Sequence, residues 1–342
     1  MTDSSAPVAP FGRVLTAMAT AFTVDGEIDE EATARIAVHL VDHGHDGLVV
    51  SGTTGEAATT TTAEDGRILR VVKDAVGGRA KIVAGVGTND TRHTLELARQ
   101  AVMLGADGLL LVTPYYNKPS QGGCTAALSV RRGGSRCSSH GLRHSRPAGT
   151  KLAPSTFETM AEWPSVVAVK DAAGDPTQAI MLRELGYAVY SGDDSLTLGF
   201  LAYGACGVVS VLGHVAGDEI RTMIDAFLSG GCRNRTGDQC PPAAGVACGH
   251  GCPPITARRR SRGALQLLGV LQNRTVRSPA TCPRRRRVRG VADGAARFGV
   301  AALTELSMHS KLSTPTFPPH MLLPGPSARV AMVVRCRRRH RW

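Results

Sequence analysis

The sequence has no apolar run long enough to cross a membrane. No stretch approaches the ~20 apolar residues of a transmembrane helix, and the N-terminus lacks the basic segment and apolar core of a secretory signal. A P-loop, a dinucleotide-binding glycine fingerprint and a His-rich cluster are also missing. We therefore expect a soluble, cytoplasmic protein that has no membrane partner, no cofactor and no metal ion.

Aromatic residues and paired cysteines are scarce as well. Aromatic residues make up 4% of the chain, which leaves few rings to stack on nucleic-acid bases. Of the nine cysteines, all but Cys206 lie in two Arg-rich stretches, so a disulfide framework is not expected. Cys248, His250 and Cys252 lie close together, but the absence of C-x-x-C spacing and of a second ligand pair disfavours a zinc site.

The net positive charge of the chain comes from its C-terminal third. The chain carries a formal net charge of +12 and a sequence pI of about 9.7, a balance typical of proteins that bind nucleic acid or membrane surfaces. Residues 1–230, however, hold 19 Lys and Arg against 25 Asp and Glu, whereas residues 231–342 hold 21 against 3, with Lys311 as the only lysine. Arginine without lysine is what GC-rich DNA yields when it is read out of frame. We therefore expect no nucleic-acid partner.

One lysine stands at the end of a buried-strand pattern. The run Val-Val-Ala-Val at residues 166–169 leads directly into Lys170, and a continuous β-branched run is typical of a parallel strand. At the end of such a strand an ammonium group loses solvation, its pKa falls, and the neutral amine can attack a ketone to form a Schiff base. A salt-bridged lysine, or one that reaches solvent, would fit the same local pattern.

Two other apolar runs end in motifs suited to ligand binding. Residues 51–56 read Ser-Gly-Thr-Thr-Gly-Glu, and such glycines and hydroxyls can form a cradle for a small carboxylate, although an ordinary strand-to-helix turn has a similar composition. Residues 113–121 read Thr-Pro-Tyr-Tyr-Asn-Lys-Pro-Ser-Gln. Two of only five tyrosines side by side at a strand end indicate a functional loop.

Strand-like runs alternate with helical patterns along residues 13–229. The seven runs lie at residues 14–21, 47–51, 81–87, 108–113, 166–169, 187–191 and 207–211. This alternation predicts an α/β fold with a parallel sheet closed by helices. The expected architecture is a (β/α)8 TIM barrel of about 250 residues, which requires one strand more. That strand should lie between residues 121 and 166.

The three motifs, in their order and spacing, resemble the dihydrodipicolinate synthase family of pyruvate-dependent class I aldolases, which belongs to the N-acetylneuraminate lyase superfamily. The resemblance covers residues 13–121 and 149–229, and the tyrosine-pair loop is its most specific element. It implies condensation of pyruvate with L-aspartate-4-semialdehyde, the first committed step toward diaminopimelate and lysine, by a homotetramer. Lys170 would form the Schiff base, and Thr53 and Tyr116 would belong to a proton relay in which Tyr116 reaches into a neighbouring subunit.

The resemblance also implies the residues that hold the substrates. Thr54 would bind the pyruvate carboxylate, and Gly192 and Val209 would line the pyruvate pocket. The relay's central tyrosine and the arginine that grips the second substrate would stand where this chain has Leu142 and Pro147. Their absence puts the activity of this polypeptide in question.

Residues 122–148 interrupt the resemblance. They contain no apolar run, although the family carries a strand here that ends in Tyr-Asp-Ile-Pro-Gly-Arg. Codons for residues 142–147 can spell that motif when the first nucleotide is dropped, which indicates compensating frameshifts; a divergent loop is the alternative. We therefore expect an N-terminal segment 1–12, a barrel domain 13–229, and an aberrant tail 230–342 in place of a small helical domain.

Two other functions remain open at this point. A sister pyruvate aldolase, such as a sialic acid or 2-keto-3-deoxy sugar acid lyase, would share Thr53, Thr54 and Lys170 but is disfavoured by Tyr115 and Tyr116. A non-catalytic basic binding protein would require a genuine tail.

Overall fold

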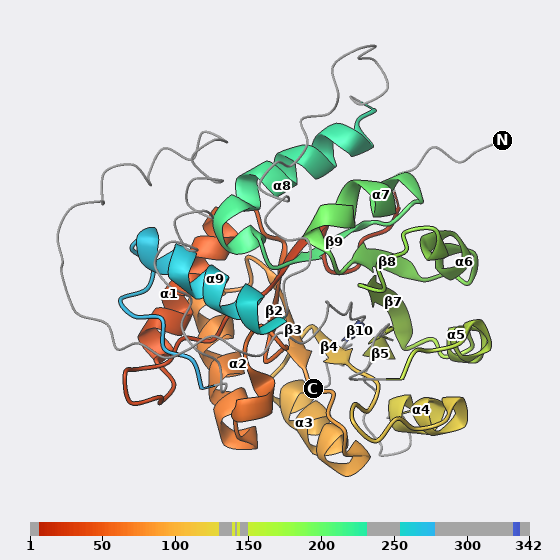
Figure 1. Ribbon diagram of the computed structural model, residues 1–342, viewed down its shortest axis with the longest axis horizontal. Helices are drawn as coiled ribbons and strands as arrows, with labels where there is room; N and C mark the ends of the chain where they lie inside the picture. The colour runs from red at the N-terminus through yellow and green to blue at the C-terminus, as the bar shows by residue number, and fades with distance from the viewer. Residues whose placement is uncertain are drawn as a thin grey trace, which may run out of the picture.

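A computed structural model describes residues 7–129, 139–140, 142–143, 150–230, 254–277 and 331–335 of the chain. Strands lie at its centre and helices surround them (Figure 1). The long parallel strands are β1 (Val14–Ala17), β2 (Gly47–Val50), β3 (Lys81–Gly85), β4 (Gly108–Leu111), β7 (Val166–Asp171), β8 (Ala188–Ser191) and β9 (Gly207–Ser210). All seven strands predicted from the sequence are confirmed.

These strands form one curled parallel sheet in the order β4-β3-β2-β1-β9-β8-β7. Leu15 in β1 is paired with Gly47 in β2 on one side and with Val209 in β9 on the other. Every residue of β1, β2, β4 and β9 is buried, because helices cover the outside of the sheet and side chains fill its inside. The α/β barrel class predicted from the sequence is confirmed.

The helices begin at residues suited to capping. Asp29 accepts a hydrogen bond from the N–H of Ala32, and Asp90 accepts one from Arg92, at the starts of α1 and α3. Thr61 and Glu64 form a reciprocal capping box at the start of α2. The helices are α1 (Glu30–Asp42), α2 (Thr62–Val76), α3 (Thr91–Met103), α4 (Gln121–Leu128), α5 (Pro154–Ala161), α6 (Gln178–Glu184), α7 (Thr197–Ala202), α8 (Gly213–Leu228) and α9 (Pro254–Leu267), with short 3-10 turns η1 (Ala57–Thr59) and η3 (Asp194–Leu196).

The position of the eighth strand is filled by short pieces. β5 (Ser139–His140) pairs in parallel with β4, and β6 (Leu142–Arg143) pairs in parallel with β7, within the interval where the sequence predicted the missing strand. β10 (Ala331–Arg335) lies antiparallel between β4 and β7 and joins them. The start of the interrupted stretch differs from the expectation, because α4 forms there, with Ser120 accepting a hydrogen bond from the N–H of Gly123.

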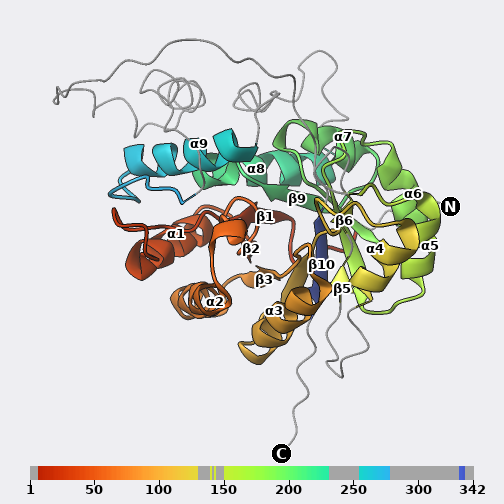
Figure 2. The same cartoon turned by 60° about the horizontal axis from the view of Figure 1, so that its bottom comes forward.

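Residues 254–277 also differ from the expected aberrant tail. α9 lies beside α8 in both views (Figures 1 and 2), and Ala264, Leu265 and Leu271 are buried. Because arginines surround these apolar residues in the sequence, the composition of the segment does not reveal its buried face. One of the arginines, Arg262, is itself only 1% exposed. The rest of the tail apart from residues 331–335, with Cys248, His250 and Cys252, lies outside the described residues.

Within the part of the chain that the structure describes, none of the helices has the length and apolar character that crossing a membrane requires. In the same residues, no group of three or more His, Cys, Asp or Glu side chains is arranged to hold a metal ion.

Candidate active site at the carboxyl ends of the strands

Lys170, the lysine that the sequence predicts to form the Schiff base, lies near the carboxyl end of a strand. It lies in β7, paired with Tyr190 of β8, and its side chain remains partly accessible. Desolvation by the surrounding barrel lowers the pKa of Lys170 to about 8, while the charge of Asp194 opposes that shift. A larger fraction of Lys170 is therefore neutral near pH 7 than for an ordinary lysine, and the neutral amine is the nucleophilic form.

Gly192 leaves the space that the Lys170 side chain occupies. It follows β8, and its N–H donates to the carbonyl of Asp171, the last residue of β7, at 2.7 Å. A Cβ atom on Gly192 would stand 3.0 Å from Lys170 Cε and 2.6 Å from Ala172 Cβ. The sequence-predicted residues Lys170 and Gly192 are thus brought together.

The turn at residues 51–56 lies at the end of β2. Thr54 is buried and Thr53 is exposed, so the two predicted hydroxyls face different environments. Ser51 and Glu56 adopt left-handed φ values of +50° and +66°, which non-glycine residues reach only where neighbouring contacts enforce them. The carbonyl of Ser51 would lie 2.3 Å from a Cβ atom on Gly85, so the turn packs tightly on the end of β3.

Tyr116 points into solvent. It has a left-handed φ of +70° and is 88% exposed, and the next residue, Asn117, donates from Nδ2 to the carbonyl of Asn89 at 3.2 Å. An exposed, backbone-strained tyrosine is unusual in a monomer surface and is typical of functional sites.

Comparison with known families identifies the chain. The model of the dihydrodipicolinate synthetase family matches residues 10–286. This chain belongs to the dihydrodipicolinate synthetase family. The family match extends past residue 230, in agreement with the packing of α9.

Individual relatives lead to the same family. A 4-hydroxy-tetrahydrodipicolinate synthase of Acidothermus cellulolyticus is 53% identical over 233 residues, which are 67% of this chain and 75% of that protein. One from Kineococcus radiotolerans is 46% identical over 280 residues, 80% of this chain and 88% of that protein. The crystal structure of a dihydrodipicolinate synthase from Bacillus anthracis matches with a TM-score of 0.72 at 31% identity, covering 84% of this chain and 98% of the other.

The family's remaining positions can now be located. Val209 is fully buried in β9, opposite Leu15 of β1. Leu142, where the family resemblance implies the central tyrosine, is paired with Lys170 across β6 and β7. Position 142 therefore lies beside Lys170 in the sheet. Pro147 is outside the described residues.

Asp194 is a site residue that the sequence analysis did not single out. Its Oδ2 accepts hydrogen bonds from the N–H groups of Val211 and Leu212 at 3.0 and 2.9 Å, and its Oδ1 accepts one from the Ser210 hydroxyl. Burial nevertheless raises the pKa of this carboxyl, and its charge acts on Lys170. The available signal in the sequence was the acidic pair at residues 193–194, directly after Gly192. Only the fold brings Asp194 close to Lys170 in β7 and to the end of β9.

Proposed function

We propose that this chain is a lyase that condenses pyruvate with L-aspartate-4-semialdehyde to give 4-hydroxy-tetrahydrodipicolinate, the first committed step of diaminopimelate and lysine biosynthesis. The observation that carries the proposal is Lys170, a lysine with a pKa lowered to about 8 that lies against Gly192 at the carboxyl end of a barrel strand, in a chain of this family.

The chemistry begins with attack of the neutral Nζ of Lys170 on the ketone carbon of pyruvate. Loss of water gives an iminium ion, and loss of a proton from the methyl carbon gives an enamine. The enamine carbon then bonds to the aldehyde carbon of the second substrate, and the aldehyde oxygen takes up a proton. Attack of the substrate's own amine on the imine carbon closes the ring and releases Lys170.

The other predicted residues receive roles from this scheme. The buried hydroxyl of Thr54 and the adjacent backbone N–H groups would hold the pyruvate carboxylate. Thr53 and Tyr116 would move protons. Gly192 and Val209 would line the pyruvate pocket. These assignments rest on the family resemblance and on the positions of the residues at the strand ends.

The exposure of Tyr116 supports assembly into a homotetramer in which this side chain completes the site of a neighbour. Equilibrium sedimentation should give the mass of four chains, and Tyr116→Ala should weaken the association. A monomer that retains full activity would contradict the shared site. The cytoplasmic location expected from the sequence stays a prediction.

Borohydride trapping tests the central step. Reduction in the presence of pyruvate should attach a three-carbon group to Lys170, which peptide mass spectrometry locates. Lys170→Arg should abolish the adduct, and Lys151, a lysine just before α5, should stay unmodified and serve as an internal control. A main adduct on another residue, or none, would overturn the assignment.

A further inference from the structure

The turn that carries Thr53 and Thr54 ends in a buried carboxylate. Glu56 is 1% exposed, and its Oε1 lies 2.8 Å from Nη1 of Arg262, which is also 1% exposed. A buried charge is tolerated only when an opposite charge and hydrogen bonds compensate it. The end of this turn therefore depends on a residue about two hundred positions away in the chain.

Arg262 connects the turn to the segment that follows β1. Its Nε and Nη2 donate to the carbonyl of Thr20 at 3.0 and 2.6 Å. A Cβ atom on Gly55 would stand 3.1 Å from the Thr20 hydroxyl and 3.2 Å from the carbonyl of Met18, so the turn already lies against this segment. One planar guanidinium thus joins the backbone at Thr20 to the side-chain carboxylate of Glu56.

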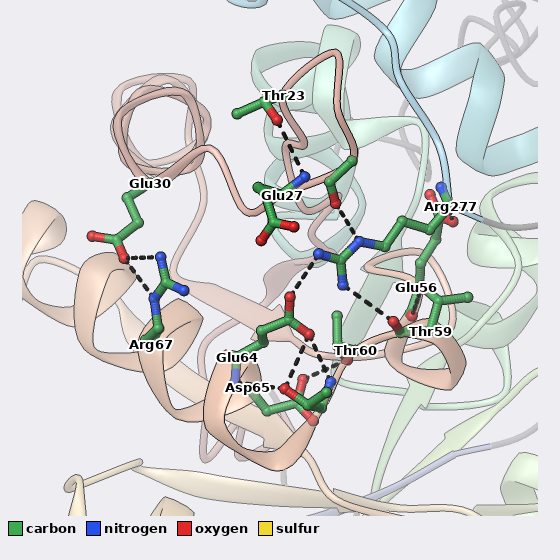
Figure 3. Close-up of polar contacts among 12 residues, drawn as sticks. Thr23, Glu27, Glu30, Glu56, Thr59, Thr60, Glu64, Asp65, Arg67 and Arg277 are labelled. Atoms are coloured by element: carbon green, nitrogen blue, oxygen red, sulfur yellow. Dashed lines mark hydrogen bonds and ion pairs between the residues drawn. The ribbon is translucent and has the colours of Figure 1, made fainter.

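Arg277 makes a second set of contacts around the same carboxylate. Its backbone N–H donates to Oε2 of Glu56 at 3.1 Å. Its guanidinium donates to Oε1 of Glu64 at 2.6 Å and to the carbonyl of Thr59 at 3.2 Å, and Figure 3 shows it pointing between them. Arg277 therefore connects both the turn, through Glu56, and the start of α2, through Glu64, to the segment that follows α9.

The ring of Phe22 lies under both arginines. The guanidinium carbons of Arg262 and Arg277 lie 5.5 and 4.7 Å from the ring centroid. These are distances at which a cation is attracted to an aromatic face, and the attraction strengthens when the pair is shielded from water. Phe22 is 2% exposed, so the ring is shielded from water.

We propose that residues 254–277 form a clasp that sets the affinity of the pyruvate site, in which Arg262 and Arg277 are positioning residues. The Arg262 side chain holds the turn 51–56 through Glu56, and the Arg277 side chain holds Thr59 and Glu64 directly beside that turn. The inference rests on the proposed function of Thr54 in that turn. Its structural basis is the strained backbone of the turn: left-handed φ values at Ser51 and Glu56 persist only while surrounding contacts enforce them. Loss of a clasp residue would let the turn relax and displace its hydroxyls and N–H groups.

The test measures how borohydride trapping of Lys170 depends on pyruvate concentration. In Arg262→Met and Arg277→Met, the half-saturating pyruvate concentration should rise by roughly 10- to 100-fold, as expected when binding groups move by a fraction of an ångström to an ångström. The extent of trapping at saturation, per folded chain, should stay unchanged. Arg262→Lys should give an intermediate value, because an ammonium restores the charge but not the forked contact with Thr20.

Arg67→Met provides the matched control. Arg67 in α2 also forms an ion pair with a glutamate: its Nη2 lies 2.7 Å from Oε1 of Glu30, at the start of α1. Both side chains, however, are about half exposed (Figure 3). Because exposed pairs contribute little, this variant should bind pyruvate within about twofold of the parent chain.

Each outcome decides a different point. Folded Arg262→Met and Arg277→Met variants with the parent half-saturation would overturn the clasp while leaving the proposed function intact. Absence of any Lys170 adduct in the parent chain would overturn the proposed function, and the clasp with it. If Arg262→Met does not fold, Arg277→Met decides the question, because the Arg277 side chain is 17% exposed and its removal leaves no fully buried charge unpaired.

Discussion

Gly192 lies directly against the stem of Lys170, close enough that a single added carbon would stand 3.0 Å from Lys170 Cε. The same carbon would stand 2.6 Å from Ala172 Cβ and 3.1 Å from the carbonyl of Asp171. Two of these neighbours are fixed parts of β7 or the residue after it, so the strain must be relieved by movement of Lys170 or of the loop after β8. The position of the Lys170 side chain therefore depends on the absence of a side chain at residue 192.

Gly192→Ala should slow trapping of pyruvate on Lys170 by roughly 10- to 100-fold, because the reactive amine is displaced from its approach to the ketone. Gly122→Ala is the matched control: it lies in α4, a Cβ atom there meets nothing within 4 Å, and alanine in a helix stabilises by about 0.5–1 kcal/mol. Trapping rates and thermal unfolding are measured for both. If Gly192→Ala traps pyruvate at the parent rate, the reactivity of Lys170 does not depend on the absence of a side chain at residue 192.

The pH dependence of trapping reports the Lys170 pKa. The rate should rise with pH through about 8, because the neutral amine is the reactive form and burial lowers its pKa from the ordinary value of 10.5. Asp194 raises this pKa by its charge, so Asp194→Asn should shift the midpoint to lower pH. A midpoint near 10.5 in the parent, or an upward shift in the variant, would contradict this electrostatic account.

The strand ends could be predicted from the sequence because their signals are local. A β-branched run before Lys170 and a glycine-rich turn after residues 47–50 specify burial and chain reversal within a few residues. Asp194 was missed because its partners, Ser210, Val211 and Leu212, follow a different strand. Only the closed sheet brings those strand ends together.

Arg262 and Arg277 illustrate the opposite error. Their surroundings in the sequence, rich in Arg and Pro, indicated a tail without a core, and composition gives no information on pairing with Glu56 and Glu64. An apolar spacing at Ala264, Leu265 and Leu271 was the available signal. The expectation of frameshifts at residues 122–148 and in the tail after residue 230 stays a prediction.

Stability should fall in acid because His214 is buried in its neutral form. Nδ1 donates to the carbonyl of Val211 at 2.7 Å and Nε2 accepts the N–H of Ala19 at 3.0 Å, so an added proton would face a donor. Burial, the largest cause, lowers the pKa of His214 to about 3. In the unfolded chain the group takes up its proton near pH 6.5, so the unfolded state binds more protons below that pH. The free energy of unfolding should therefore fall between pH 6.5 and about 3, by up to about 1.4 kcal/mol per pH unit for this group.

Urea unfolding of His214→Gln checks this. Glutamine can make the same two hydrogen bonds without titrating, so the variant should lose stability less steeply than the parent between pH 6.5 and 4. His45, whose pKa burial lowers to about 4, and His39, whose pKa burial also lowers, would contribute further dependence in the same direction. An unchanged slope in the variant would mean that His214 is already protonated in the native state or does not titrate in the unfolded one.

Replacing residues 142–147 by Tyr-Asp-Ile-Pro-Gly-Arg should raise condensation activity. Leu142 is paired with Lys170 across β6 and β7, so a tyrosine at this position would enter the sheet beside the nucleophile, where the family resemblance places the centre of the relay. We expect the parent chain to trap pyruvate but to turn over slowly, because it lacks that proton-transfer group and has Pro147 in place of the arginine that the family resemblance implies.

In the replaced chain, Tyr116→Phe should lower turnover by ~10²–10⁴, the usual contribution of a positioned proton-transfer group, while trapping on Lys170 persists. Turnover of the parent chain, the replaced chain and its Tyr116→Phe variant is measured by the consumption of L-aspartate-4-semialdehyde in the presence of pyruvate. Equal turnover in the parent and the replaced chain would show that another residue transfers the proton, and normal turnover in Tyr116→Phe would make this exposed tyrosine a contact between subunits alone.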